Sequence, residues 1–367
     1  MRNTIFIITC VFLSAVFGSV AGYTQEMNED NWSLSEQGAG FVEHMGRKSL
    51  RLNNGFAVLN NGNFKDGIIT FDISMPKERG FAGIYFRWND NTAEHFYLRS
   101  HLSEKPDATQ YTPRFNGLGG WQIYHGERYS VPSKYDLGSW ASVKLVIKDN
   151  KMDVYINSDK PSLHVDNLMA PNVAGSIRFS GARQDFHISN FRAVADATVE
   201  TIGEPKPRVP FPENLITSFN VGKTTVASAD VEKEAILDSD LLAQQSWQTL
   251  EVDESGAANL ARISGRTGDV NTLLVKLDIS SDAERIIPIQ YGFSDRVTVF
   301  LNGKAIAYGD DTYRSRDYRH LGTVGLYDSV FLPLKKGENQ LVFAVTEAFG
   351  GWAIKAAMDP VSGVTVR

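Results

Sequence analysis

The sequence predicts an all-β protein made of two antiparallel β-sandwich (jelly-roll) domains. Short runs of alternating apolar and polar residues recur along the chain, and turns rich in Asn, Asp and Gly separate them. No long stretch has the 3.6-residue periodicity of an amphipathic helix. A proline-rich segment divides the 367 residues, and each part is long enough to bury a core of its own.

The N-terminus has the features of a secretion signal. A short positive start precedes the apolar residues 5–20, and Ser19 and Ala21 are the small residues of a cleavage site. The apolar run is too short for a membrane span, although a retained anchor is the alternative. We expect residues 1–21 to be a signal peptide and the protein to be secreted or periplasmic in a bacterium.

Composition excludes several kinds of function. The net charge of -6 and the lack of a basic stripe argue against a nucleic-acid partner. The only cysteine, Cys10, lies inside the expected signal peptide. The mature chain would therefore have no disulfide, no thiolate metal site and no cysteine nucleophile.

The first sandwich is expected over residues 26–198. Its alternating segments are residues 32–35, 40–43, 49–53, 55–59, 64–74, 81–88, 94–101, 140–147, 152–156, 175–180 and 186–193. A linker is expected at 199–213, because four prolines between 205 and 212 prevent a continuous sheet. The second sandwich is expected over 214–367. Its segments are 216–221, 271–279, 286–293, 296–301, 329–334 and 340–347, with one short helix within 231–244.

A hairpin in the first sandwich is the main candidate for function. Residues 81–88 and 94–101 alternate between apolar and polar side chains, and a segment rich in turn-forming residues separates them. A five-residue loop at 89–93 would place the apolar side chains of both strands on one face and the polar and aromatic ones on the other. The side chains expected to face the core are Ile84, Phe86, Phe96 and Leu98. The side chains expected on the opposite face are Tyr85, Arg87, His95, Tyr97, Arg99 and His101.

This polar face is expected to bind carbohydrate. Aromatic rings pack on the apolar faces of sugars, and Arg and His donate hydrogen bonds to hydroxyl or carboxylate oxygens. The expected binding residues are Tyr85, Arg87, His95, Tyr97, Arg99, His101, Gln110, Tyr111, Asn116, Trp121, Gln122 and Tyr124. The alternative is structural, with Arg87 paired to Glu94 across the strands and the tyrosines merely covering the sheet.

Five phrases in the first domain resemble the concanavalin A-like lectin and glucanase superfamily. Within it, they resemble the laminin-G-like domains grouped with the 3-keto-disaccharide hydrolases. The phrases are residues 71–73, 83–87, 94–99, 140–147 and 153–156. The resemblance covers about residues 27–195 and implies a glycan lying across the concave sheet. Residues 299–304 and 334–341 resemble turns of galactose-binding-like jelly rolls, which implies the fold of the second domain.

An enzyme acting on glycans is the competing hypothesis. The resemblance to sandwich glucanases implies Glu-x-Asp-x-x-Glu on one strand, but Glu94 is the only acidic residue of its strand, and Asp107 lies beyond the following loop. Jelly-roll alginate lyases have the pattern Gln-x-His on a strand. In this sequence the residue two positions after Gln122 is Tyr124 in place of His, and His125 comes one position too late. The catalytic residues of an enzyme, including a hydrolase of the keto-disaccharide type, would be His101, Tyr97 and Asp107. A hydrogen bond from His101 or His95 to Tyr97 or Asp107 in a closed pocket would favour catalysis. A shallow groove would favour binding.

Other partners are less specific. Turns at 89–91 and 310–311 have oxygen donors for a structural calcium ion, but such residues are common in turns. No cofactor is expected, and no motif indicates zinc or iron. The charged, aromatic loop 310–325 is expected to hold the two domains together or, alternatively, to bind ligand. A third hypothesis for the whole chain is a two-module structural protein of a surface assembly.

Overall fold

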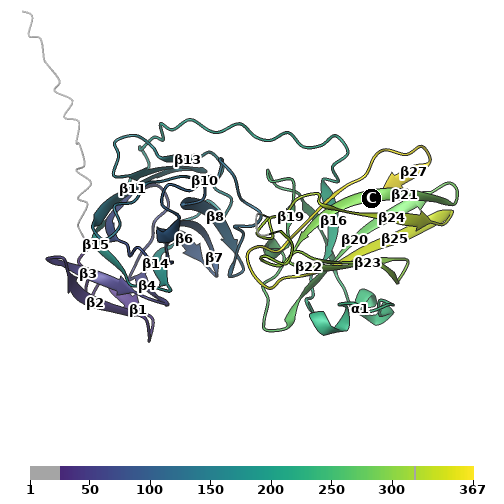
Figure 1. Cartoon of the computed structure of the whole chain (residues 1–367), viewed down its shortest axis with the longest axis horizontal. Coiled ribbons are helices and arrows are strands. Elements are labelled where there is room, and N and C mark those ends of the chain that lie inside the picture. Colours follow the sequence, from purple (N-terminus) through teal and green to yellow (C-terminus); the bar gives the residue numbers. More distant parts are fainter. Residues whose placement is uncertain (1–24, 318–319) are drawn as a thin grey trace, which may run out of the picture.

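Strands account for most of the regular structure in the computed structural model, which describes residues 25–317 and 320–367 (Figure 1). The expected signal peptide, with Cys10, lies outside the described residues, as do two residues of the 310–325 loop. Every pairing between the described strands is antiparallel, as in the pairs β6–β7 and β20–β25. The prediction of an all-β protein with antiparallel sandwiches is therefore confirmed.

The first sandwich consists of two sheets. The sheet that carries the predicted hairpin has, in spatial order, β1 (Trp32–Leu34), β4 (Gly55–Leu59), β14 (Ser176–Ala182), β6 (Phe81–Asn89), β7 (Thr92–Arg99), β8 (Thr109–Phe115) and β10 (Ser130–Val131), with β9 (Leu118–Gly119) paired to β8. The sheet behind it has β13 (Leu163–Val165), β12 (Lys151–Ile156), β11 (Trp140–Lys148), β5 (Gly67–Ser74), β15 (Phe186–Ala195), β3 (Arg47–Leu52) and β2 (Ala39–His44).

The second sandwich also has two sheets. Its larger sheet has β18 (Trp247–Glu251), β16 (Ser218–Gly222), β20 (Val270–Ser281), β25 (Gly337–Thr346), β22 (Arg296–Leu301) and β23 (Lys304–Asp310), with β17 (Val226–Ala227) and β27 (Val364–Val366) on β20. Its smaller sheet has β19 (Ala258–Asn259), β26 (Ala353–Ala357), β21 (Arg285–Ser294) and β24 (Asp328–Leu334). The helical elements are α1 (Ser239–Ala243), η1 (Ser100–Leu102), η2 (Ser228–Asp230) and η3 (Leu260–Arg262). No helix in the described chain is long and apolar enough to cross a membrane.

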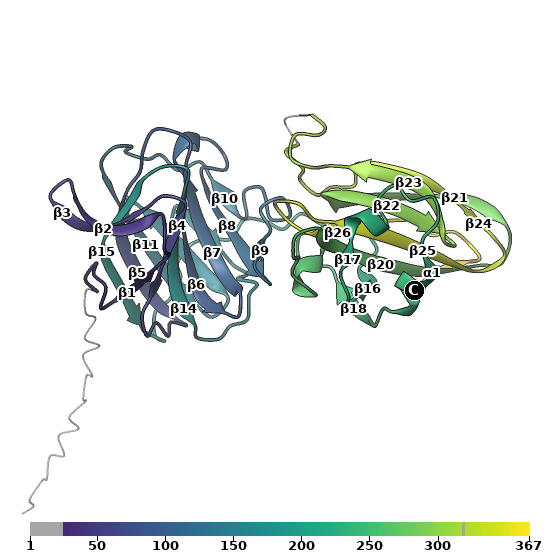
Figure 2. The ribbon, with the colours of Figure 1, turned by 90° about the horizontal axis from the view of Figure 1, so that it is seen from below.

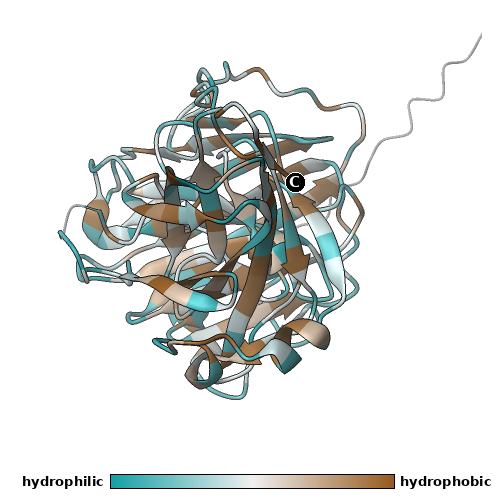
Figure 3. Cartoon of the chain, turned by 90° about the vertical axis from the view of Figure 1, so that its right-hand side faces the viewer, coloured by the Kyte–Doolittle hydropathy of each residue, from teal (hydrophilic) through white to brown (hydrophobic). Residues whose placement is uncertain are grey.

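Period-2 alternation determines which side chains fill each core. In the first sandwich, Ile84 and Phe96 pack with Phe71 and Val143 of the opposite sheet. In the second, Leu277 of β20 packs in a separate apolar cluster. Figure 3 shows apolar (brown) residues mainly along the strands and polar (teal) residues mainly in the outer loops. The face of the hairpin sheet turned away from the first core is called the outer face below.

The segment 196–217 connects the two sandwiches and contains no strand (Figure 1). Its first part is attached to β12, where the carboxylate of Asp153 accepts hydrogen bonds from the backbone N–H groups of Ile202 and Gly203. Further along, the carbonyl of Lys206 accepts a hydrogen bond from Arg128. The segment therefore runs along the surface of the first sandwich before it reaches the second.

β8 and β9 lie on the side of the first sandwich that faces the second (Figure 2). The residues after β9 form a turn through Ile123. This turn inserts toward the second sandwich, where the side chain of Gln122 donates to the carbonyl of Leu321. The Tyr124 hydroxyl donates to Asp253. These contacts place the end of the outer face beside the second sandwich.

Candidate functional site

The hairpin differs from its predicted register. Asn89 pairs with Thr92 across a two-residue turn, so the predicted five-residue loop is wrong. Both turn residues have positive φ, 43° at Asp90 and 64° at Asn91, as in the tight turns that match the strand twist. A β-bulge between Phe86 and Asn89 takes up the difference.

The bulge turns Arg87 inward, which contradicts its predicted place on the binding face. Its backbone has a φ of 52°, and the residue is 1% exposed. The guanidinium forms an ion pair of 3.0 Å with Asp66 and donates to the carbonyls of Lys65 and Asp149. Arg87 therefore joins the two sheets and is not available to a glycan. The structural alternative is also corrected, because the partner of Arg87 is Asp66 and not Glu94.

On the outer face, the remaining predicted aromatic residues stack on one another. The rings of Tyr85 and His95 lie 3.9 Å apart with an interplanar angle of 9°, and those of His95 and Tyr97 lie 4.8 Å apart at 18°. The guanidinium of Arg99 lies 4.7 Å from the centre of the Tyr97 ring. A side chain at Gly83 would collide with the His95 ring, so this glycine makes the stack possible. We call these four stacked side chains the ladder.

The ladder corrects the expected binding mode. Carbohydrate recognition by stacking requires an exposed ring face, but in the ladder the ring faces contact one another. Tyr85 and Tyr97 are each only 8% exposed. Burial and the charges of Arg114, Arg178 and Arg99 hold the pKa of His95 well below its usual range. The ladder therefore offers ring edges and a neutral imidazole, and no stacking platform.

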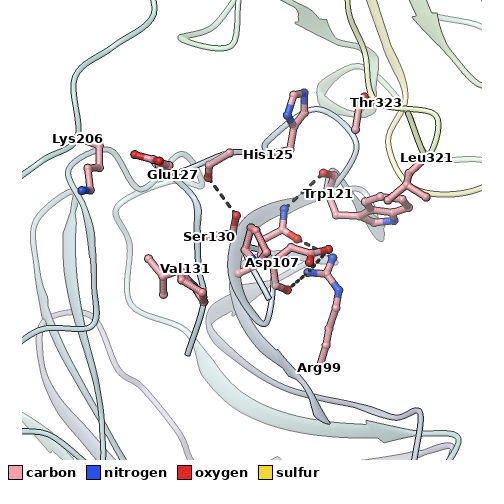
Figure 4. A pocket seen from close by; sticks show the side chains of 14 residues that line it. Arg99, Asp107, Trp121, His125, Glu127, Ser130, Val131, Lys206, Leu321 and Thr323 are labelled. Atoms are coloured by element: carbon pink, nitrogen blue, oxygen red, sulfur yellow. Dashed lines mark hydrogen bonds and ion pairs between the residues drawn. The ribbon is translucent and has the colours of Figure 1, made fainter. Parts of the chain in front are cut away.

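A pocket of about 410 Å³ opens at the Arg99 end of the ladder (Figure 4). Arg99 and Asp107 lie on its floor, and Trp121 stands beside them. Gln110 also lines the pocket. The other lining residues are Pro106, His125, Gly126, Glu127, Ser130, Val131, Pro132, Lys206, Leu321 and Thr323. The pocket thus combines the end of the outer face with the connecting segment and the second sandwich.

Hydrogen bonds fix the floor of this pocket. Arg99 donates to Tyr97 Oη at 2.7 Å and to Gln110 Oε1 at 2.6 Å. It also donates to the carbonyl of Asp107, whose carboxylate lies 3.6 Å away and is 41% exposed. Gln110 in turn donates to the carbonyl of Tyr124. Because Arg99 and Gln110 are already satisfied, Asp107 presents the most accessible charged group of the floor.

Trp121 forms the rim between the two sandwiches. Its ring centre lies 6.0 Å from that of Tyr313 and 6.0 Å from that of Phe349, both in the second sandwich. Phe349 is 60% exposed. Unlike the rings of the ladder, Trp121 is partly exposed and lines the pocket. It is the aromatic residue best placed to contact a ligand there.

The other predicted binding residues have structural partners. Tyr111 is fully buried and donates to Glu94, while Asn116 donates to the carbonyl of Ala261 in the second sandwich. Gln122 and Tyr124 are also fully buried, in the contact with the second sandwich already described. Tyr111, Gln122 and Tyr124 are therefore removed from the predicted binding set, because the second sandwich or the core covers them. Asn116 is exposed but lies outside the pocket lining, so it is removed as well.

The three residues proposed for catalysis are not assembled. His101 lies in η1 with its ring edge-on to Phe81 at 5.3 Å, and its buried Nδ1 has no partner. Burial raises the pKa of Tyr97, so its hydroxyl stays protonated and is not available to accept a proton from a substrate. The buried Nε2 of His95 also has no hydrogen-bond partner. Within the described chain, the hydrogen bonds that would favour catalysis are not formed.

The residues considered for a pair of catalytic carboxylates and for calcium have structural partners. Glu94 faces the core, where it accepts hydrogen bonds from Tyr111 and from the backbone of Ala170. At one turn suggested for calcium, the carboxylate of Asp310 accepts from Thr312. No group of three or more His, Asp or Glu residues between 25 and 317 or between 320 and 367 is arranged to hold a metal ion.

Sequence reasoning missed several residues near the site. Arg114 and Arg178 project from β8 and β14 on the outer face, and His125 lines the pocket. Arg178 stands between Ile177 and Phe179 in an alternating strand, a signal that could have placed it. The position of His125 had no such signal, because the turn after β9 is irregular.

Comparison with known proteins assigns no family to the chain. No family model and no curated protein matches it. Among solved structures, the carbohydrate-binding module CBM66 from Bacillus subtilis aligns over 44% of this chain and 93% of its own, with 12% identity and a TM-score of 0.34. A β-glucanase from Bacillus licheniformis aligns over 48% of this chain and 98% of its own, with 10% identity and a TM-score of 0.37. A prokaryotic β-1,3-1,4-glucanase from a mouse hindgut metagenome aligns over 47% and 97%, with 9% identity and a TM-score of 0.36. Identities and TM-scores this low carry no argument about function.

Proposed function

We propose that this chain is a carbohydrate-binding protein whose ligand enters the pocket between Asp107 and Trp121. The supporting observation is that a partly exposed indole and an accessible carboxylate line the same pocket of about 410 Å³. Pockets of about 300–1,000 Å³ suit small ligands. An aromatic ring covers the apolar face of a sugar, and a carboxylate accepts hydrogen bonds from its hydroxyl groups.

The protein is also proposed to be exported, because its N-terminal residues have the pattern of a signal peptide. Two domains are proposed. Residues 26–198 form a laminin-G-like domain, residues 214–367 form a galactose-binding-like domain, and residues 199–213 form the linker between them. The loop 310–325 would hold them together, since Leu321 and Val324 form hydrogen bonds with Gln122. In this arrangement the second domain completes the wall of the binding site.

The test is glycan binding by the mature protein and two variants. Trp121→Ala removes the ring and Asp107→Asn removes the charge at nearly constant volume. Each is expected to weaken binding about tenfold or more, which corresponds to about 1.4 kcal/mol. Affinities would be measured by calorimetry for a glycan selected on an array.

Phe331→Ala is the matched control, because Phe331 is an exposed aromatic residue on β24 of the second sandwich, outside the pocket lining. It should leave the affinity unchanged. Wild-type affinity in both pocket variants, with folding verified by circular dichroism, would show that the pocket does not bind the glycan.

A further inference from the structure

Two arginines on the outer face have no acidic partner. Arg114 and Arg178 form no ion pair in the described chain, and the Nε atom of each is buried without a hydrogen-bond partner. By contrast, Arg87 and Arg99 are each paired with an aspartate. A buried donor without a partner costs free energy, so such groups usually have a function or a ligand.

The two guanidinium groups lie around the same rings. Arg114 is 5.7 Å from the centre of Tyr85 and 5.9 Å from that of Trp88. Arg178 is 5.6 Å from Tyr85, 4.8 Å from Trp88 and 3.9 Å from Phe56. Since both are measured to common centres, the two cations are at most about 11 Å apart. Packing against rings restricts both side chains to this arrangement.

The neighbouring strands do not offset the charge of the pair. The outward positions of the neighbouring strands carry no Asp or Glu: they are Phe56, Val58, Ser180, Gly83, Tyr85, His95, Tyr97, Gln110 and Thr112. The whole chain, however, has a net charge of -6. Burial, together with the nearby charge of Arg114, lowers the pKa of Arg178. The two like charges therefore lie near each other without an acidic partner, and an anion between them would relieve the repulsion.

From this geometry we infer that Arg114 and Arg178 form a binding site for the anionic group of an acidic glycan. This deepens, and rests on, the proposed function, because it assigns the charge of the ligand. The shared chemistry is a planar or tetrahedral oxyanion, either a uronate carboxylate or a sulfate ester, and guanidinium groups bind both through paired hydrogen bonds. The ladder runs from these arginines to Arg99 at the pocket, so one oligosaccharide could contact both ends.

The experiment compares Arg114→Gln and Arg178→Gln with Arg192→Gln, a control at an exposed position of β15 in the opposite sheet. Three probes of equal length are used: a uronate oligosaccharide, a sulfated oligosaccharide and a neutral one. Inorganic sulfate is a fourth probe. Wild-type protein and the control should bind at least one acidic oligosaccharide about tenfold more tightly than the neutral one. Each site variant should lose most of this preference, and added salt should reduce it.

The outcomes separate this inference from the proposed function. Equal binding of acidic and neutral oligosaccharides, or an unchanged preference in both site variants, overturns the anion site. If binding of the neutral oligosaccharide still depends on Trp121 in that case, the proposed glycan pocket is supported without the anion site. Sulfate binding that requires the two arginines, without binding of any oligosaccharide, refutes the glycan function and overturns the assignment of this site to a glycan. Preference for the uronate or for the sulfated probe identifies the source of the anion.

Discussion

Replacement of Arg87 by Met should destabilise the first sandwich, because this arginine joins its two sheets from within. The side chain is fully buried, and Asp66 is 9% exposed at its side chain. Removal of the guanidinium leaves the Asp66 carboxylate without its cation and removes the donor to the carbonyls of Lys65 and Asp149. Breaking one partner of a buried pair typically costs about 3–5 kcal/mol, so we expect a loss of that size in Arg87→Met.

Urea denaturation of the mature protein measures this loss. Arg114→Met is the matched control, since its guanidinium has no acidic partner, and it should change the free energy of unfolding by less than about 1 kcal/mol. A double-mutant cycle with Asp66→Asn isolates the pair and should give a coupling energy of about 1–3 kcal/mol. A loss in Arg87→Met no larger than in the control would refute the view that Arg87 is a structural residue.

Two further predictions concern buried polar groups. Burial raises the pKa of Glu94 from 4.5 to about 7, so the fold retains a proton that the unfolded chain releases. Wild-type stability should fall between pH 4.5 and 7 relative to Glu94→Gln, by up to about 3 kcal/mol, and parallel pH profiles of unfolding would contradict this. Gln122 donates to Leu321 and accepts from Ser294, so Gln122→Ala should loosen the contact between the sandwiches by about 1–3 kcal/mol. Limited proteolysis should then cut the 310–325 loop faster, and an unchanged cleavage rate would show that other contacts are sufficient.

The alternation of the hairpin strands predicted side-chain faces better than it predicted the loop. Ile84 and Phe86 do lie in the core with Phe96, as expected, because a two-residue change in pairing preserves the period of two. The same reasoning failed at Arg87, since a bulge adds one residue and reverses the direction of the side chain. Alternation contains no signal for a bulge when the residue concerned is polar and the loop is rich in turn-forming residues.

The sequence by itself determined the all-β class and the faces of the regular strands, because these depend on local periodicity and turn chemistry. Only the tertiary structure decided which polar residues remain accessible. Gln122 and Tyr124 have the chemistry of a sugar site but lie beneath the second sandwich, more than a hundred residues away in sequence. Arg114 and Arg178 come together only because β14 pairs with β6. Such neighbours depend on long-range strand pairing, which no local pattern encodes.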